Sequence, residues 1–298
     1  MAISRTQLVK ELEPGLNALF GLEYKRYENQ HAEIYVTESS DRAFEEEVML
    51  SGFANAQTKA EGQGVAFDSA QETYTARYTH DTIALAFAIT EEAIEDNLYD
   101  RISSRYTKAL ARSMSNAKQV KAVTPLIDGL PSTDGFDSGD GVSLFNTAHT
   151  TVSGTNVKNT LTTQADLNET SLEQSLIDIA AMTDERGLRI AARGVKMIIP
   201  SANQFTAERL MKSQGRTGTA DNDINAIGSM GMIPQGYRVN NYLTDSDSFY
   251  IITDVPNGMK MFQRAPLKTA MEGDFDTGNV RYKARERYSF GVSDYRGI

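Results

Sequence analysis

The chain contains no cysteine, and only three of its 298 residues are histidine: His31, His80 and His149. Without cysteine there is no disulfide, no thiolate nucleophile and no Cys-ligated zinc or iron–sulfur site. No run of 18 apolar residues occurs, and the polar N-terminus, residues 1–5, has no signal-peptide core. These absences, with 40% apolar residues for a core, favour a soluble intracellular globular protein.

Familiar catalytic and nucleotide-binding motifs are also absent. There is no P-loop, no H-E-x-x-H and no G-x-S-x-G, and residues 62–64 lack the third glycine of a dinucleotide-binding turn. Residues 221–225 begin like a calcium loop, but Ala226 and Met232 replace its turn glycine and closing glutamate. His149 could act as a base, yet no nucleophile can be paired with it, so a structural role is favoured. We expect no catalytic residue, cofactor or metal site; a hydrolase with motif-free carboxylates is the enzyme alternative.

Negative charge is concentrated in one third of the chain. The formal net charge is -10, and residues 20–100 hold 17 acids and 5 bases, whereas residues 101–298 hold 21 acids and 23 bases. The acidic balance argues against a protein that wraps nucleic acid by neutralising phosphates. The run Glu45-Glu46-Glu47 lies in this stretch. It is either solvated surface or it lies on a basic surface of a neighbouring subunit, where charge complementarity would set the register.

Residues 4–20 have the pattern of an amphipathic helix. Their leucines recur at three- or four-residue spacings, at Leu8, Leu12, Leu16 and Leu19. Pro14-Gly15 predicts that the helix breaks and restarts. The apolar stripe needs a surface to cover it, either in its own domain or in a neighbouring subunit.

A strand and a long hairpin are expected next. Residues 33–37 read as a strand. From Phe44 to Ile89, period-2 alternation flanks a glycine-containing centre, which predicts a two-stranded excursion with a polar tip. Because an isolated hairpin is only marginally stable in water, another surface should hold it.

The clearest element is a long helix over residues 91–123. Acids crowd its first turns and bases, including Arg101 and Arg105, follow, which is the order that the helix dipole favours. Thr124-Pro125 is expected to end it. A helix of about 33 residues reaches roughly 50 Å, which suits a spine that supports a sheet.

After this helix, residues 126–165 read as an irregular connector with short strands. An α/β pattern follows, with a helix opened by a capping box at Thr170 to Glu173. The remaining elements are expected in this order: a strand at 195–199, a helix at 201–212, strands at 237–239 and 249–253, and an alternating tail at 281–295.

Three stretches, in this order, carry a resemblance to a known family. They are Leu144-Phe145-Asn146-Thr147-Ala148-His149-Thr150; the region from Ala165-Asp166-Leu167 through Asp184-Glu185-Arg186-Gly187 and Ile199-Pro200-Ser201 to Phe205-Thr206-Ala207-Glu208-Arg209-Leu210; and the ending Arg285 to Gly297. Together they resemble the major capsid proteins of tailed bacteriophages, with the Hong Kong 97-type fold, and among these the head proteins of Mu-like phages.

The resemblance implies an α+β fold with defined parts. These are an N-terminal arm (1–32), a peripheral-domain strand (33–40), an extended loop or E-loop (41–80), a peripheral domain (81–159) with spine helix 91–123 and the irregular connector, an axial domain (160–270), and return strands of the peripheral domain (271–298). It also implies a non-enzymatic protein that self-assembles into hexamers and pentamers of an icosahedral shell around phage DNA. The alternative on the same fold is an encapsulin-like shell that encloses a cargo enzyme.

The same resemblance implies partners and contact residues. The partners are copies of the chain, a portal protein, a scaffolding protein and, in some relatives, a decoration or cement protein; DNA is enclosed without sequence-specific binding, and no membrane is involved. Because the arm begins near Met1, scaffolding is expected to be a separate protein or absent. The expected location is the virion, with assembly in the host cytoplasm. Candidate contact residues between subunits are Leu8, Leu12, Leu16, Glu45, Glu46, Glu47, Lys59, Arg101 and Arg105.

Lys59 is the only lysine between residues 26 and 107. Some members of the resembled family join a loop lysine to an asparagine of another subunit by an isopeptide bond. No partner asparagine can be matched in this sequence, so an ion pair between subunits or a solvated side chain is favoured for Lys59.

Overall fold

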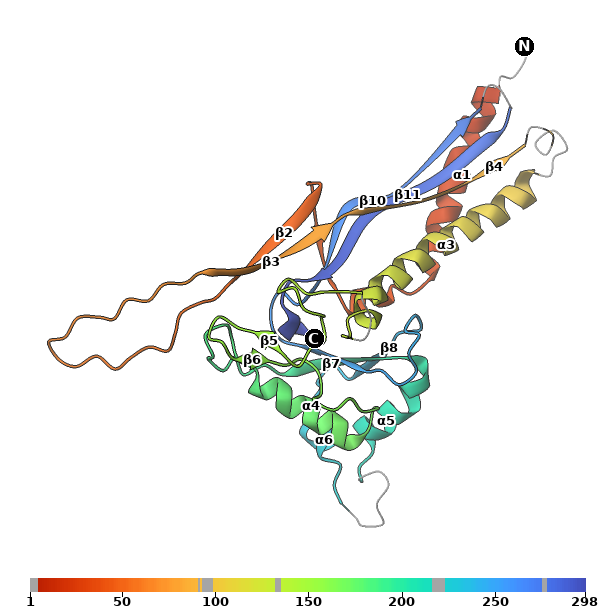
Figure 1. The fold of residues 1–298 in the computed structure, drawn as a ribbon. Coiled ribbons are helices and arrows are strands. Elements are labelled where there is room, and N and C mark those ends of the chain that lie inside the picture. Colours follow the sequence, from red (N-terminus) through yellow and green to blue (C-terminus); the bar gives the residue numbers. More distant parts are fainter. Residues whose placement is uncertain (1–4, 91, 93–98, 132–134, 216–222, 275–277) are drawn as a thin grey trace.

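The computed structural model describes residues 5–90, 92, 99–131, 135–215, 223–274 and 278–298. Figure 1 shows an elongated sheet flanked by two helices, a lobe built around a smaller sheet, and a hairpin that projects away from both. The mixture of helices and sheets confirms the expected α+β class. None of the described helices combines the length and apolar character needed to cross a bilayer.

The elongated sheet has the strand order β1-β10-β11-β4. β1 (Val36–Ser39) runs parallel to β10 (Met259–Gly273), and β11 (Val280–Val292) is antiparallel to both β10 and β4 (Asp81–Ile89). β1 starts three residues later than expected, because Gln30–Glu33 form a short 3-10 helix, η1. β10 was not predicted, and the expected boundary at residue 270 falls inside it.

Two helices cover one face of this sheet. α1 (Arg5–Arg26) and α3 (Tyr99–Ile127) lie side by side along it (Figure 1). Leu16 and Phe20 of α1 pack with Leu110 and Met114 of α3 and with Tyr282 of β11. This cluster buries Leu16 and Phe20 of α1 and Leu110, Ala111 and Met114 of α3 within the chain.

Both expected proline breaks were wrong. α1 is one helix that passes through Pro14, and α3 continues through Pro125 to Ile127. A proline inside a helix removes one backbone hydrogen bond and costs about 3 kcal/mol. Burial of Phe20 after Pro14 and of Leu126 after Pro125 offsets that cost. The expected start of the long helix, apart from residue 92, lies outside the described residues.

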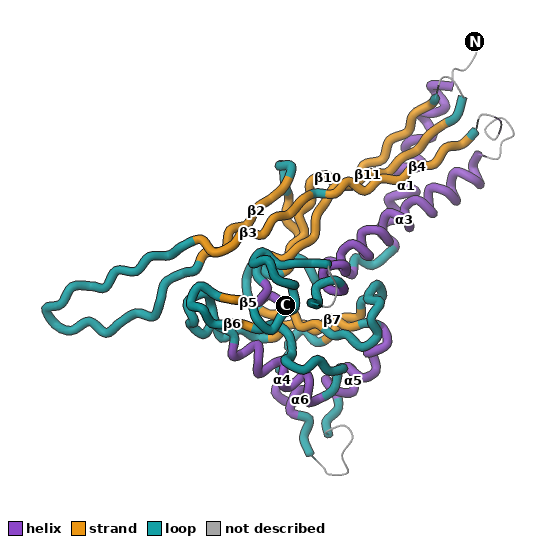
Figure 2. The backbone as a smooth tube through the Cα atoms, viewed as in Figure 1, coloured by secondary structure: helices purple, strands orange, loops and turns teal. Residues whose placement is uncertain are grey.

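The hairpin consists of β2 (Phe44–Leu50) and β3 (Glu72–Thr79), paired antiparallel. An extended loop, residues 51–71, connects them and projects far from the rest of the chain (Figure 2). The two-stranded excursion therefore ends at Thr79 rather than Ile89, because β4 leaves the hairpin and joins β11.

The second lobe surrounds the sheet β8-β7-β9. β7 (Gly194–Ile199) pairs parallel with β8 (Tyr237–Val239) and antiparallel with β9 (Tyr250–Thr253). The helical segments of the lobe are α4 (Glu169–Ala181), η2 (Ser201–Asn203), α5 (Gln204–Lys212) and α6 (Ala226–Met230). The capping box of α4 is formed by Asn168 and Ser171, two residues before the predicted start, because their side chains exchange hydrogen bonds with each other's backbone N–H.

The chain between α3 and α4 is mostly loop, as predicted, with the short pair β5 (His149–Thr150) and β6 (Asn156–Val157) (Figure 2). One hydrophobic core joins this connector to both sheets. The C-terminal turn η3 (Tyr295–Gly297) and Ile298 are buried in that core, so the chain end links the elongated sheet to the lobe.

Candidate functional surfaces

The loop of the hairpin has few contacts, which lie near its base and include a hydrogen bond from the Arg186 guanidinium to the carbonyl of Ser69 at 2.5 Å. The backbone N–H of Ser51 donates to the carbonyl of Gln71 at 2.9 Å, and the N–H of Gln71 donates to the Ser51 hydroxyl at 3.0 Å. Residues 53–70 are all exposed. They include apolar side chains, of which Phe67 is 99% exposed. Exposed aromatic side chains on a long loop are typical of a surface that binds another molecule. They are uncommon on proteins that stay monomeric.

The three consecutive glutamates at the base of the hairpin alternate between the two faces of β2. Along β2, Glu45 and Glu47 are half-buried, whereas Glu46 is exposed and lies 3.8 Å from Arg77. Glu45 accepts a hydrogen bond from the Ser40 hydroxyl at 2.7 Å. Glu47 contacts Lys260 and Ser293 of the same chain. Glu46 is therefore the one of the three that is exposed, and its ion pair with Arg77 lies at the surface.

Lys260 explains why Glu47 is held in place. Its side chain is 8% exposed, and its ammonium group lies between Glu47 and Glu38, the latter at 3.1 Å. Burial tends to lower the pKa of Lys260, but the hydrogen bonds to the two carboxylates outweigh it and raise this pKa. The cluster fastens the base of the hairpin to β10 and β1.

The other predicted contact residues fall into two groups. Leu16 is buried in its own chain against α3, so it offers no free surface to another subunit. Lys59 and Arg105 are exposed, and neither forms an ion pair with any part of the chain that the structure describes. The side chains of Leu8, Leu12 and Arg101 lie outside the described residues.

His149 is a structural residue. It is fully buried and stacks on Tyr295 with the ring centroids 3.8 Å apart. Its Nδ1 lies 2.6 Å from Asp140 and its Nε2 lies 3.3 Å from Asn159. Burial acts to raise the pKa of Asp140, but hydrogen bonds from His149 and Ser138 prevail and lower it. Because the ring is buried and both of its nitrogens contact residues of the connector, this pair stabilises the connector.

The sequence did not reveal a buried ionic cluster at the C-terminus. The Arg296 guanidinium contacts Glu185 at 2.6 Å and Asp294 at 3.2 Å, and donates to the carbonyl of Thr183 at 2.9 Å. All three charged side chains are buried. Residues 184–187 and 294–297 both belong to the stretches that carry the family resemblance, but no spacing rule predicted their contact.

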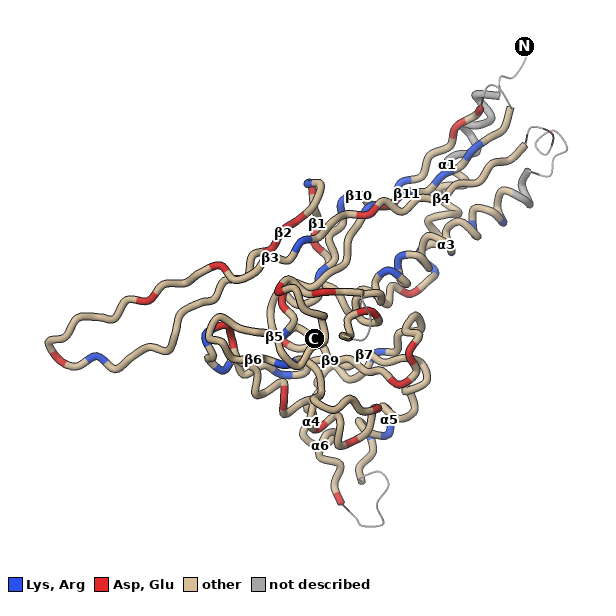
Figure 3. Tube along the Cα trace, in the orientation of Figure 1, with Lys and Arg blue, Asp and Glu red and all other residues tan. Residues whose placement is uncertain are grey.

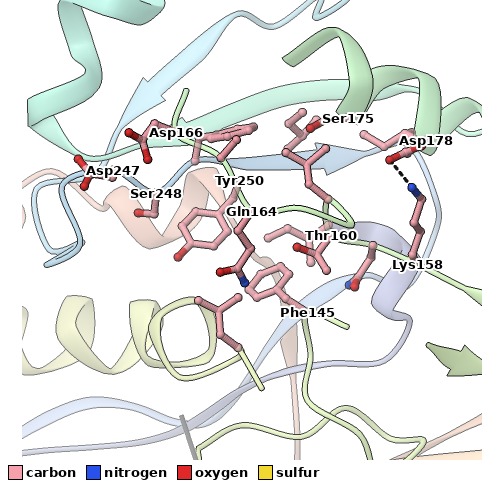
Figure 4. A pocket seen from close by; sticks show the side chains of 18 of the residues that line it. Phe145, Lys158, Thr160, Gln164, Asp166, Ser175, Asp178, Asp247, Ser248 and Tyr250 are labelled. Atoms are coloured by element: carbon pink, nitrogen blue, oxygen red, sulfur yellow. Dashed lines mark ion pairs between the residues drawn. The ribbon is translucent and has the colours of Figure 1, made fainter. Parts of the chain in front are cut away.

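A mostly apolar cavity lies between the connector and the lobe (Figure 4). It encloses about 290 Å³, with Phe145, Tyr250 and Ile298 among its lining residues. Asp178 at its edge is paired with Lys158 at 2.8 Å. The residues around it form no acid–base pair with a nucleophile, and within the described ranges no three His, Asp or Glu side chains are grouped to hold a metal ion.

The fold is shared with proteins that form shells. The chain aligns with the capsid of Myoviridae phage XM1 at a TM-score of 0.54, with 11% identity over 88% of this chain and 87% of the other. It aligns with the capsid of an empty GTA particle at 0.53, with 12% identity over 89% and 86%. For the procapsid of bacteriophage JBD30 the TM-score is 0.51, with 13% identity over 98% of this chain and 74% of the other.

The sequence itself identifies the family. Residues 72–298 match the family model described as phage capsid protein. The chain therefore belongs to the phage capsid protein family and has a structural role in the shell, as the resemblance implied. No curated protein sequence matches it. The encapsulin-like alternative is not favoured, because the matching model is that of the phage capsid proteins.

Proposed function

We propose that this chain is the major head protein of a tailed phage, and that it assembles with its own copies into hexamers and pentamers of an icosahedral shell around DNA. The extended loop of the resembled family corresponds to β2, β3 and loop 51–71. In the assembled shell this hairpin lies over a neighbouring subunit. Portal and scaffolding proteins are the expected partners of the shell, which is located in the virion after assembly in the host cytoplasm.

The exposure of loop 51–71 is the observation that carries the proposal. Phe53, Val65 and Phe67 are each more than half exposed on a segment with few contacts to its own chain. Burying them against a neighbour removes apolar surface from water, at about 25 cal/mol per Å². Repeated around a ring, a contact in which one copy's loop meets a different surface of the next copy closes into a symmetric assembly.

Negative-stain microscopy and size-exclusion chromatography of the purified chain test this proposal. Rings or closed particles are expected. The variant Phe67→Ser should lower the particle yield without lowering the melting temperature of the subunit, because Phe67 is 99% exposed. Ile177→Ser, on the exposed side of α4, removes a comparable exposed side chain and should leave the yield unchanged.

A chain that stays monomeric at every concentration and salt condition would contradict the proposal. Equal particle yields for wild type and Phe67→Ser would show that the loop does not carry the contact. Particles that co-purify with a cargo enzyme instead of DNA would favour the encapsulin-like alternative.

A further inference from the structure

The helix α3 is basic within an acidic chain. Its residues, Tyr99–Ile127, include six bases and one acid, whereas the whole chain has a formal net charge of -10. Two of the bases are paired within the subunit, Lys118 with Glu286 at 3.2 Å and Lys121 with Asp81. Figure 3 shows Lys and Arg recurring along this helix. The bases that are not paired within the subunit are candidates for a contact with another molecule.

Three of these bases form a row on the side of α3 that faces away from the sheet. Arg105, Lys108 and Arg112 are exposed, whereas Leu110 and Met114 are buried against the sheet and α1. Residues three and four apart are neighbours on a helix surface, so the three cations lie within about 10 Å along the helix axis. Within the part of the chain that the structure describes, none of the three forms an ion pair. We call Arg105, Lys108 and Arg112 the basic stripe.

A shallow groove between α3 and α1 runs beside the basic stripe. Its lining includes Glu23 and Tyr27 of α1 and Lys108, Arg112, Ser113 and Asn116 of α3. Glu23 is the one acid in the described lining, and it is engaged within α1: the Tyr27 hydroxyl donates to it at 3.1 Å and Arg26 lies 3.5 Å away. The Ser113 hydroxyl and the Asn116 amide are donors of the kind that contact phosphate oxygens. The groove therefore offers cations and neutral donors to an anionic partner.

The basic stripe and the hairpin lie on opposite sides of the elongated sheet. In β11, Tyr282 and Ala284 pack against the helices. Farther along the strand, the Ser289 hydroxyl contacts His80 at 3.0 Å and Gly291 lies beneath Tyr78 of the hairpin. Even- and odd-numbered side chains of a strand leave opposite faces of a sheet. The contacts that the proposed function assigns to the hairpin thus leave the outer side of α3 free.

We propose that the basic stripe binds phosphates of the enclosed DNA, and that this side of α3 therefore faces the interior of the shell. The inference rests on the proposed function. It assigns Arg105 to DNA rather than to a contact between subunits. The negative charge of the whole chain does not oppose such a local contact, because exposed charges farther away than about 10 Å are largely screened at 0.1 M salt.

The chemistry of the groove favours DNA over a protein partner. Protein interfaces are usually centred on aromatic or large apolar side chains that become buried. The α3 residues next to the cations in this groove are Ala109, Ser113 and Asn116, which are small or polar. A phosphate backbone needs only cations and hydrogen-bond donors, in any base sequence.

The salt dependence of DNA binding tests the contact. A labelled duplex is titrated with the full chain, at protein concentrations below those that give particles, and fluorescence anisotropy reports binding. Three phosphate contacts account for a slope of about -2.7 in log K against log salt concentration, or about a fortyfold loss of affinity from 50 to 200 mM salt. The variant Arg105→Gln, Lys108→Gln, Arg112→Gln should lose this part of the slope and bind at least tenfold more weakly at about 50 mM salt.

The matched control removes the same charge from the other face of the sheet. Lys268, Lys283 and Arg285 are exposed there, and Lys268 pairs with Arg285 in the ladder. The variant Lys268→Gln, Lys283→Gln, Arg285→Gln should keep the slope of the wild type. All six side chains in the two variants are exposed, so both should melt like the wild type.

The direction of α3 in the shell is tested separately. Because the chain has no cysteine, Asn116→Cys introduces a single thiol in the groove. Particles of this variant are treated with a small biotin-maleimide, and a blot of the denatured protein confirms the label. Avidin, which is too large to cross a closed shell, should capture labelled free subunits but not intact particles. Capture of intact particles would overturn the inference.

The remaining outcomes distinguish the inference from the proposed function. If the wild type forms no particles, the proposed function fails, while the DNA titration is still read on the free subunit. Equal slopes for the wild type and the basic-stripe variant overturn the inference, and so does an equal loss in the control variant, because binding would then follow net charge. A basic-stripe variant that binds DNA normally but gives fewer particles would show that the basic stripe contacts protein, which also overturns it.

Discussion

The ring of Tyr78 in β3 lies directly against Gly291 in β11, where a Cβ atom would stand 2.6 Å from the ring atom Cε1. The same ring packs edge-on against Phe262 with the centroids 4.7 Å apart, and its hydroxyl contacts Ser293. The hairpin is thus joined to the elongated sheet by an aromatic side chain that needs a glycine beneath it.

The substitution Gly291→Ala should displace Tyr78 and destabilise the subunit by about 1–3 kcal/mol, the usual cost of overpacking a core. Chemical denaturation of the unassembled subunit measures this. Gly273→Ala is the matched control in the same sheet, because no atom lies within 4 Å of the added methyl group. Equal stabilities for the two variants would mean that Tyr78 relaxes without cost and does not fix the hairpin.

Glu47 and Glu46 are adjacent but should respond differently to neutralisation. Glu47→Gln leaves the buried Lys260 with one carboxylate instead of two, and a cost of about 1–3 kcal/mol is expected. Glu46→Gln removes only an exposed contact with Arg77 and should change stability by less than about 0.5 kcal/mol. Urea unfolding of both variants provides the comparison. A larger loss for Glu46→Gln would contradict the assignment of Glu47 as the anchoring residue.

Phe20 and Leu22 of α1 lie two residues apart but differ strongly in burial. Phe20 is 1% exposed and Leu22 is 73% exposed. Phe20→Ala should cost about 3–5 kcal/mol, because it leaves a cavity between α1, α3 and β11. Leu22→Ala should leave the melting temperature nearly unchanged. If both variants melt like the wild type, the C-terminal half of α1 does not belong to the core of its own subunit.

Elements with strong local signals could be predicted from the sequence. The strand Tyr237–Val239 was placed correctly, as were the body of the long helix and the alternating tail that forms β11. β10 could not be predicted from the sequence, because Pro266 and two register shifts interrupt the period-2 alternation on which strand prediction depends. Its extended conformation is imposed by pairing with β11, which no local pattern shows.

The directions of the candidate surface residues were only partly predictable. Period-2 alternation alone separates Glu46 from Glu45 and Glu47. The ion pairs Glu47–Lys260 and Arg296–Glu185 could not be predicted, because they join residues far apart in the chain. The acidic charge of the hairpin was visible in the sequence.

His31 gives a pH dependence that can be measured. Burial, followed by the nearby charge of Lys118, lowers the pKa of His31 to about 4 from its ordinary 6.5. Below pH 6.5 the unfolded chain therefore binds a proton at this residue that the folded chain does not. Its contribution to stability is fully present above pH 6.5 and is lost as the pH falls towards 4, by up to about 3 kcal/mol.

The substitution His31→Gln removes this titration. Its free energy of unfolding should therefore fall less than that of the wild type between pH 6.5 and pH 4, and the difference between the two curves isolates His31 from the other acid-sensitive groups. Parallel curves would contradict a lowered pKa. The imidazole NMR signal of His31 checks the pKa directly, and its assignment is simple because the chain has only three histidines. A midpoint near 6.5 in the folded subunit would mean that His31 is solvated rather than packed against Gln119 and Phe290.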